Sequence, residues 1–278
     1  MSSSERTSSN SPTPSGPSLP SLLNLCLRDP SRVLATLREI EAERIPTRYR
    51  FHPEQYLPEV LGVQLFEGFT LPIVRRVAAS WLHLHARERH ARGLEWEQWQ
   101  TDTRPDLPHW RPGQAIVNTF ILQGGHKQGK SVLAAALLLW AVHVSERFSG
   151  VVYAPVTGQA LTTTWRYVDM FLDGELGGKP HCLAGLRSSR RGGTLKPGLD
   201  LGHGRGVTTK ATKEGVTVQG EHASGGEEDF PTSLHLCEEA DGIDRPAVFD
   251  AISSIVAGGI SLWLVCLNPE SPLSPAQS

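Results

Sequence analysis

The eight residues from Gly124 to Ser131 constrain this 278-residue chain more than any other segment. They read Gly-Gly-His-Lys-Gln-Gly-Lys-Ser and match the pattern GxxxxGK[ST]. Glycines allow backbone N–H groups to wrap around a phosphate, because no Cβ stands in the way. A helix that starts at Lys130 directs the positive end of its dipole at the same anion. The segment therefore predicts a phosphate-binding loop.

Two side chains of this loop carry specific chemistry. We expect Lys130 to reach the β- and γ-phosphates of ATP, and the Ser131 hydroxyl to bind Mg²⁺, a hard cation that prefers oxygen. A glycine-rich turn that carries Lys-Ser by chance is disfavoured, because a strand precedes the loop and the apolar helix Val132–Val144 follows it. The predicted nucleotide-binding residues are Gly124, Gly125, His126, Lys127, Gln128, Gly129, Lys130 and Ser131.

Apolar segments of strand length alternate with helical ones from Ala115 onward. Such alternation predicts an α/β fold with a mainly parallel sheet flanked by helices. With the phosphate loop, this is the fold of a P-loop NTPase of the ASCE type, which has a catalytic glutamate on an additional strand. The expected strands are Ala115–Leu122, Gly150–Ala154, Leu234–Cys237 and Ile260–Cys266, and the expected helices are Val132–Val144, Gln159–Leu172 and Asp244–Val256.

The N-terminal part of the chain has a different composition. Residues 1–20 are rich in Ser and Pro with almost no large apolar side chain, so we expect them to be disordered. Residues 21–112 are expected to be a helical N-terminal region, with one helix after Asp29-Pro30 and another over Leu71–Ala91. The segment Gly93–Gln114 is expected to be an irregular packed loop. Residues 113–278 then form the predicted ATPase core.

Composition excludes several classes of protein. The formal net charge of -2 gives no global basic field, so any DNA contact must come from a local patch. Four cysteines without CxxC spacing argue against a zinc site or a disulfide framework and favour a reducing intracellular setting. The longest apolar run is too short to span a bilayer, so no membrane association is expected. His83, His85 and His90 lack an i,i+4 pair, which favours a solvated polar face over a metal site.

Two carboxylates follow the predicted strand Leu234–Cys237. At the carboxyl edge of a parallel sheet, Glu238 and Glu239 would face the nucleotide crevice. We assign Glu238 to Mg²⁺, together with Ser131, and Glu239 to the attacking water. The alternative is an acidic cap after a strand, which the upstream phosphate loop makes less favoured.

The order of these motifs resembles that of phage large terminase subunits over roughly Phe51 to Pro269. Four further pieces carry the resemblance: Val151–Pro155 followed by Gln159, the segment Gln219–Ala223 before the acidic strand, Glu238–Ile243 at its end, and Asn268-Pro269 after the last strand.

The resemblance implies an ATP-hydrolysing motor that translocates double-stranded DNA into a capsid in the cytoplasm of a bacterial host. Its partners would be the portal, the small terminase subunit and further copies of itself in a ring. Lys130, Glu239 and Asn268 would be catalytic, with Asn268 sensing the γ-phosphate. Gln64 is a weak substitute for the family's adenine-contacting glutamine. The chain ends nine residues after Pro269, so no nuclease activity is expected.

Two other functions remain open on the sequence: a truncated prophage remnant that binds nucleotide without motor activity, and another P-loop translocase of helicase-like type. A glycine-rich basic segment is interpreted as a solvated loop, in preference to a DNA contact or an arginine finger. Its basic residues are Arg187, Arg190, Arg191, Lys196, Arg205, Lys210 and Lys213.

Overall fold

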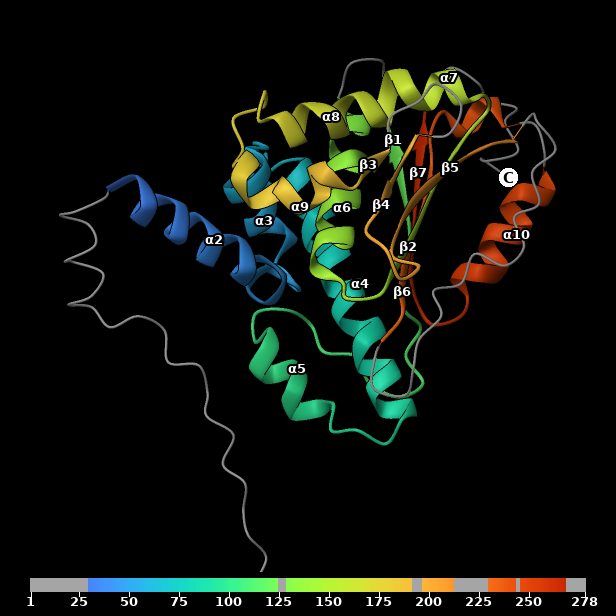
Figure 1. The fold of residues 1–278 in the computed structure, drawn as a ribbon. Coiled ribbons are helices and arrows are strands. Elements are labelled where there is room, and N and C mark those ends of the chain that lie inside the picture. Colours follow the sequence, from blue (N-terminus) through green and yellow to red (C-terminus); the bar gives the residue numbers. More distant parts are fainter. Residues whose placement is uncertain (1–29, 125–128, 192–196, 213–229, 244–245, 269–278) are drawn as a thin grey trace, which may run out of the picture. The chain divides into compact units, whose positions relative to one another are not determined.

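The computed structural model describes residues 30–124, 129–191, 197–212, 230–243 and 246–268 (Figure 1). The chain divides into two compact units, residues 1–41 and residues 42–278. Helix α2 (Pro30–Tyr49) crosses this boundary and begins at the proline that the sequence places in a first helical turn. Everything described below lies in the second unit.

A seven-stranded sheet forms the centre of the second unit, with strand order β1-β7-β6-β2-β5-β4-β3. The pairs β1–β7, β7–β6, β6–β2 and β2–β5 are parallel, whereas β5–β4 and β4–β3 are antiparallel. The predicted α/β fold with a mainly parallel sheet is therefore confirmed. The strands are β1 (Thr119–Gln123), β2 (Phe148–Ala154), β3 (Arg190–Arg191), β4 (Gly198–Asp200), β5 (Gly206–Ala211), β6 (Thr232–Cys237) and β7 (Ile260–Leu267).

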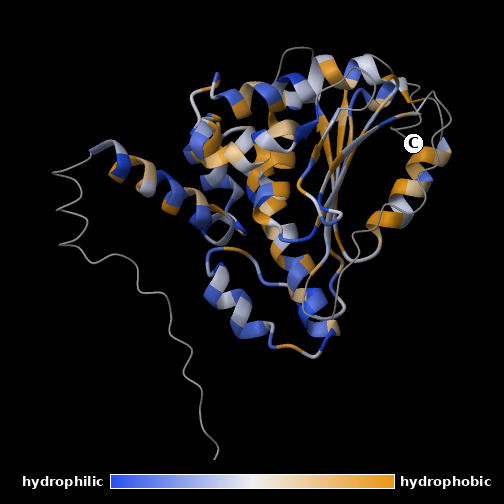
Figure 2. Cartoon of the chain, in the orientation of Figure 1, coloured by the Kyte–Doolittle hydropathy of each residue, from blue (hydrophilic) through white to orange (hydrophobic). Residues whose placement is uncertain are grey.

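The central strands are buried on both faces, as expected when helices cover both sides of a parallel sheet. All six residues of β6 are buried, and its register pairs Leu236 with Val152 of β2 and with Leu264 of β7. Hydrophobic colouring is concentrated on these strands and on the helix beside them (Figure 2). Because these strands run in the same direction, their carboxyl ends meet at one edge.

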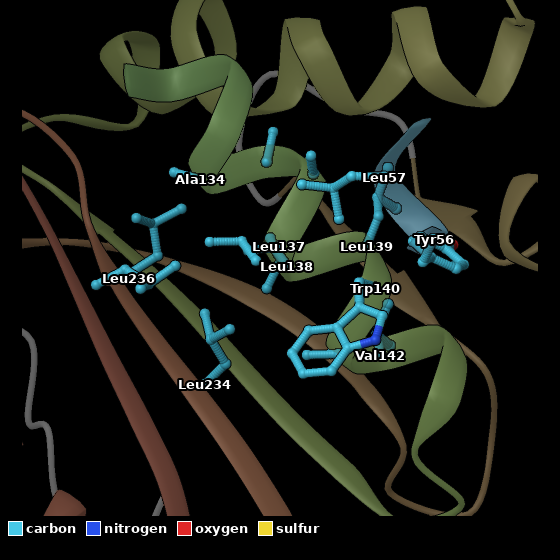
Figure 3. Packing of buried hydrophobic residues seen from close by; sticks show 14 of the residues in the cluster. Tyr56, Leu57, Ala134, Leu137, Leu138, Leu139, Trp140, Val142, Leu234 and Leu236 are labelled. Atoms are coloured by element: carbon cyan, nitrogen blue, oxygen red, sulfur yellow. The ribbon is translucent and has the colours of Figure 1, made fainter. Parts of the chain in front are cut away.

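Helix α6 (Lys130–Val144) packs on one face of the sheet. Its residues from Leu133 to Val142 are all buried, which explains why the helix is apolar nearly all round (Figure 3). The side chains of Leu137 and Leu138 point toward the sheet residues Leu234 and Leu236 (Figure 3). Helix α10 (Pro246–Val256) packs on the other face.

Further helices extend the layer that contains α6. The side chain of Trp140 meets Trp81 of α4 edge to face, at 5.3 Å between ring centroids, and donates from Nε1 to the Tyr49 carbonyl at 2.9 Å. The remaining helices of the second unit include α3 (Pro53–Leu61), α4 (Thr70–Ala91), α5 (Glu97–Thr103), α8 (Arg166–Asp173) and α9 (Ala184–Ser188). Short 3-10 turns lie at Pro180–Leu183 and Ala240–Gly242.

Two expectations about local structure were wrong, and a third was confirmed. The glycine-rich basic segment contains strands β3, β4 and β5 rather than a solvated loop, because β5 pairs with β2, β4 with β5 and β3 with β4, and propensity does not predict these pairings. Helix α5 lies within Gly93–Gln114, where an irregular loop was expected. The helix expected over Gln159–Leu172 is confirmed, because α7 (Thr157–Ala160), a π-helical turn (Leu161–Trp165) and α8 follow one another without a break.

One histidine of α4, His85, differs from the expected solvated face, whereas His90 is exposed as expected. His85 is buried, because its position four residues after Trp81 places it on the packed side of the helix. His83 lies beside the Pro108 carbonyl at 2.6 Å, and the His90 ring contacts the rings of Trp96 and Trp110. Within the described ranges, no helix is both long enough and apolar enough to cross a membrane.

Candidate functional site

The predicted phosphate loop joins the end of β1 to the start of α6. Gly124 lies directly after β1, and its N–H is 3.4 Å from the Leu267 carbonyl of β7. Gly129 precedes α6 with a φ of 80°, a left-handed conformation that glycine adopts without strain. Gly125, His126, Lys127 and Gln128 lie outside the described residues.

Lys130 links the two ends of this loop to the last strand. Its Nζ donates hydrogen bonds to the Gly124 carbonyl and, at 3.1 Å, to Oδ1 of Asn268. Asn268 follows β7 directly, and its backbone N–H is 3.4 Å from Oδ1 of Asp241. The predicted sensor Asn268 therefore contacts the predicted phosphate-binding lysine. Pro269 lies outside the described residues.

Glu238 lies directly after β6, and its backbone N–H continues the ladder to the Tyr153 carbonyl at 2.8 Å. The residue is only 1% exposed, yet both carboxylate oxygens accept hydrogen bonds. Ser131 Oγ is 3.3 Å from Oε2, and Thr164 Oγ1 is 2.7 Å from Oε1. Burial raises the pKa of Glu238 and the neighbouring Glu239 raises it further, while the two hydroxyls and Lys130 lower it; the net pKa lies above the usual value.

Glu239 has a left-handed backbone, with a φ of 46°. Successive residues of a strand point to opposite faces, so an extended Glu239 would point away from Glu238. The left-handed residue breaks this alternation, and both carboxylates line the same cavity. Non-glycine residues in this conformation cost about 1 kcal/mol or more and are concentrated at functional sites.

The helical segment after β2 contributes polar side chains that the sequence did not single out as site residues. Gln159 Nε2 donates to Oε2 of Glu239 at 2.5 Å. Thr163 and Tyr167 line the cavity, and Thr164 bonds to Glu238. These residues come from α7, the π-helical turn and α8, and π-helical turns occur frequently at functional sites.

These groups surround a polar cavity of about 170 Å³ at the carboxyl edge of the sheet. We call it the carboxyl-edge cavity. It brings together the predicted Gly129, Lys130, Ser131, Glu238, Glu239 and Asn268. Gln64, the weak candidate for an adenine contact, is exposed and does not line it. The remaining lining residues are Val132, Thr162, Thr163, Tyr167, Cys266 and Leu267.

The described members of the predicted basic set do not line this cavity, and the four arginines among them have partners. Arg187 pairs with Asp173 at 2.7 Å and Arg190 with Asp169 at 2.6 Å, while Arg205 donates to the Val142 carbonyl at 2.7 Å. Arg191 forms an ion pair with Asp200. Lys210 lies on β5, and Lys196 and Lys213 fall outside the described residues. These contacts give no support to a DNA-binding patch or an arginine finger here.

No protein-family model and no curated protein matches the sequence. The structure is similar to the crystal structure of the HK97 bacteriophage large terminase, with 16% identity and a TM-score of 0.36. The similarity covers 56% of this chain and 30% of that chain, so this protein spans less than a third of the terminase it matches. At this TM-score, functional inference rests on the residues of the carboxyl-edge cavity itself.

Proposed function

We propose that the chain is the ATP-hydrolysing motor domain of a phage DNA-packaging terminase and acts on double-stranded DNA. The observation that carries the ATPase part is the convergence of Lys130, Ser131, Glu238, Glu239 and Asn268 around one polar cavity at the carboxyl edge of a parallel sheet. The DNA substrate, the ring, the portal, the small subunit and the bacterial cytoplasm are supported by the resemblance of the motifs and their order.

The oxygens around Ser131 suit a magnesium ion. Ser131 Oγ and Glu238 Oε2 lie 3.3 Å apart, and hydroxyl and carboxylate oxygens are the protein ligands that Mg²⁺ prefers. Burial of Glu238 also favours a cation beside it, because desolvation of an anion is offset by an opposite charge. Ser131 and Glu238 would hold the ion, directly or through its water shell. When bound, Mg²⁺ would neutralise charge that develops on the phosphate oxygens.

The remaining residues position the reactants. Lys130 binds the β- and γ-phosphates, with the help of the backbone N–H groups at the start of α6. Glu239 accepts a hydrogen bond from the attacking water and orients it toward the γ-phosphorus. Gln159 holds Glu239 through its 2.5 Å hydrogen bond. Asn268 Oδ1 lies 3.1 Å from Lys130 Nζ, so Asn268 is placed to respond when the γ-phosphate leaves.

A hydrolysis assay with and without DNA tests this function. The parent is compared with Lys130→Ala and Glu239→Gln, and the matched control is Glu175→Gln, because Glu175 is exposed and does not line the cavity. We expect turnover stimulated by double-stranded DNA in the parent and the control, and none in the two site variants.

Other outcomes point to other functions. Nucleotide binding without turnover in the parent would support a remnant that has lost motor activity. Stimulation by single strands alone would support a helicase-like translocase. Unchanged turnover in Lys130→Ala would overturn the assignment of the cavity.

A further inference from the structure

A second cavity lies at the opposite, amino edge of the sheet. Its lining includes Thr232, the first residue of β6, and Ser145 and Arg147, which connect α6 to β2. Its volume is about 220 Å³. We call it the amino-edge cavity. It shares no lining residue with the carboxyl-edge cavity, so its role lies beyond the proposed ATPase function.

Aromatic rings form the walls of this cavity, with His85 at their centre. The centroid of the His85 ring lies 5.1 Å from Phe51, 5.3 Å from Trp81, 5.9 Å from Phe230 and 6.5 Å from Trp99. These rings come from α4, α5 and segments far apart in the sequence. Such walls suit a flat aromatic ligand, which can pack against several rings.

Three buried polar atoms among the lining residues have no hydrogen-bond partner in the part of the chain that the structure describes. They are His85 Nε2, Trp81 Nε1 and Ser145 Oγ, in residues that are 7%, 0% and 6% exposed. Burial, together with the nearby Arg50 and Arg89, lowers the pKa of His85 to about 3, so its imidazole is neutral at physiological pH. Unpartnered buried polar groups are rare in folded proteins and call for a missing partner. An indole N–H is a donor, and the other two groups can donate or accept.

Arginines line the more exposed side of the cavity. Among the described lining residues, Arg50, Arg89 and Arg147 contribute three cations and Glu146 contributes one carboxylate. Glu146 is 68% exposed and pairs with Arg50 at 2.6 Å. The Arg89 guanidinium lies over the Trp99 ring, 5.0 Å from its centroid. An aromatic cage alone would also suit a cationic ligand, but the excess of arginine favours an anion.

We propose that the amino-edge cavity binds a free nucleoside monophosphate, with the base against the aromatic cluster and the phosphate at the arginines. A nucleobase is flat and carries donors and acceptors on its edge, which matches the neutral imidazole, the hydroxyl and the indole N–H. The size also fits, because a cavity of about 150 Å³ accommodates benzene and this one is larger. The phosphate remains at the partly exposed arginines, where it keeps contact with solvent.

Binding is measured by isothermal titration with AMP, GMP, CMP and TMP in the Lys130→Ala background, without divalent cations. These conditions weaken binding at the phosphate loop, so failure of the proposed ATPase function does not affect the result. We expect at least one monophosphate to bind with quenching of tryptophan fluorescence, because Trp81 and Trp99 form the walls. Its nucleoside should bind about tenfold more weakly, through loss of the phosphate contacts.

Three variants locate the site. His85→Phe and Arg147→Gln should each weaken binding about tenfold or more. His83→Gln is the matched control on the same helix and should leave binding unchanged, because His83 does not line the cavity. If His85→Phe fails to fold, as judged by thermal unfolding, Arg147→Gln still decides the result.

The proposal is overturned if no monophosphate binds at millimolar concentration, which would leave only water in the cavity. It is also overturned if binding survives in both His85→Phe and Arg147→Gln. Tighter binding of a 5′-phosphorylated oligonucleotide than of every monophosphate would mean that the cavity binds the end of a nucleic-acid strand. This result would contradict the proposal of a free monophosphate.

Discussion

The two edges of the sheet bury polar groups in opposite ways. At the carboxyl edge, Glu238 is 1% exposed, and both of its oxygens accept hydrogen bonds from Ser131 and Thr164. At the amino edge, His85 is 7% exposed, and its Nε2 has no hydrogen-bond partner among the described residues. The first arrangement satisfies both oxygens of a buried carboxyl group, whereas the second leaves buried polar atoms that a ligand can satisfy.

Strand direction explains this difference. The parallel strands deliver Glu238 and Asn268 to one edge, where the N-terminus of α6 adds backbone N–H groups. The amino edge receives the C-terminal end of α6 and the aromatic residues of α4 and α5, so it is lined by rings. Substitutions at one edge should therefore leave the other edge unaffected.

The largest expected effect is that of Glu239→Gln. The amide keeps the size of the side chain but cannot accept a proton, so we expect kcat for ATP hydrolysis to fall by about 10² to 10⁴. ATP affinity should stay within about threefold of the parent, and binding of a monophosphate at the amino edge should not change. Steady-state kinetics and titration measure these quantities. A large loss of ATP affinity would mean that Glu239 binds the nucleotide.

Gln159→Leu should have a smaller effect at the same edge. The substitution removes the 2.5 Å hydrogen bond to Glu239 without touching Lys130 or Ser131. We expect kcat to fall about tenfold while KM stays the same, since a misplaced base affects the reaction more than binding. A fall in Tm that accompanies the fall in kcat would instead indicate that Gln159 has a purely structural role.

Glu238→Gln tests the pH dependence of the carboxyl edge. The folded-state pKa of Glu238 is raised above its usual value, chiefly by burial, so the folded protein binds this proton more tightly than the unfolded chain does. Stability contributed by the protonated carboxyl is present at low pH and is lost as the pH rises through the raised pKa. Without nucleotide, Glu238→Gln should therefore raise Tm at pH 7, and the gain should disappear below the usual carboxyl pKa. Thermal unfolding of both proteins at pH 7 and at a pH below the usual carboxyl pKa checks the sign of the change in Tm.

Bound Mg²⁺ and ATP should reverse this difference in Tm between the parent and Glu238→Gln. We expect the pair to stabilise the parent and to stabilise Glu238→Gln much less, because the carboxylate supports the metal. Equal stabilisation of both proteins would contradict a metal site at Glu238.

The smallest expected effect concerns the amino edge. His85→Phe replaces a buried ring that has an unsatisfied nitrogen with an apolar ring of similar shape, so we expect the free energy of unfolding to rise by about 1 kcal/mol. Hydrolysis of ATP should not change. Chemical denaturation measures the first quantity, with His83→Gln as the control. Destabilisation by His85→Phe would indicate that His85 has a structural partner.

The sequence predicted the central sheet well, because β7 is buried on both faces and reads as a nearly continuous apolar run, and the Leu234–Cys237 half of β6 is mostly apolar. It did not predict β4 and β5, since short glycine-containing strands depend on pairing with a neighbour. The phosphate loop and the two glutamates were recognisable because their spacing and position after strands follow from the chemistry. Those predicted roles remain proposals.

Other site residues depend on tertiary structure. Gln159 meets Glu239 only because β2 and β6 are neighbours, and a single sequence does not specify that strand order. The missing i,i+4 pair among His83, His85 and His90 predicts a solvated face, but the spacing of His85 from Trp81 places it on the packed side of α4. The amino-edge cavity brings together rings from distant segments, so no local pattern predicts it.

A structure with Mg²⁺ and a non-hydrolysable ATP analogue tests the central claim most directly. We predict that the γ-phosphate contacts Lys130 Nζ, and that the ion lies about 2.1 Å from Ser131 Oγ on the side that faces Glu238. A triphosphate bound away from Lys130, or a metal ion remote from both Ser131 and Glu238, would contradict it.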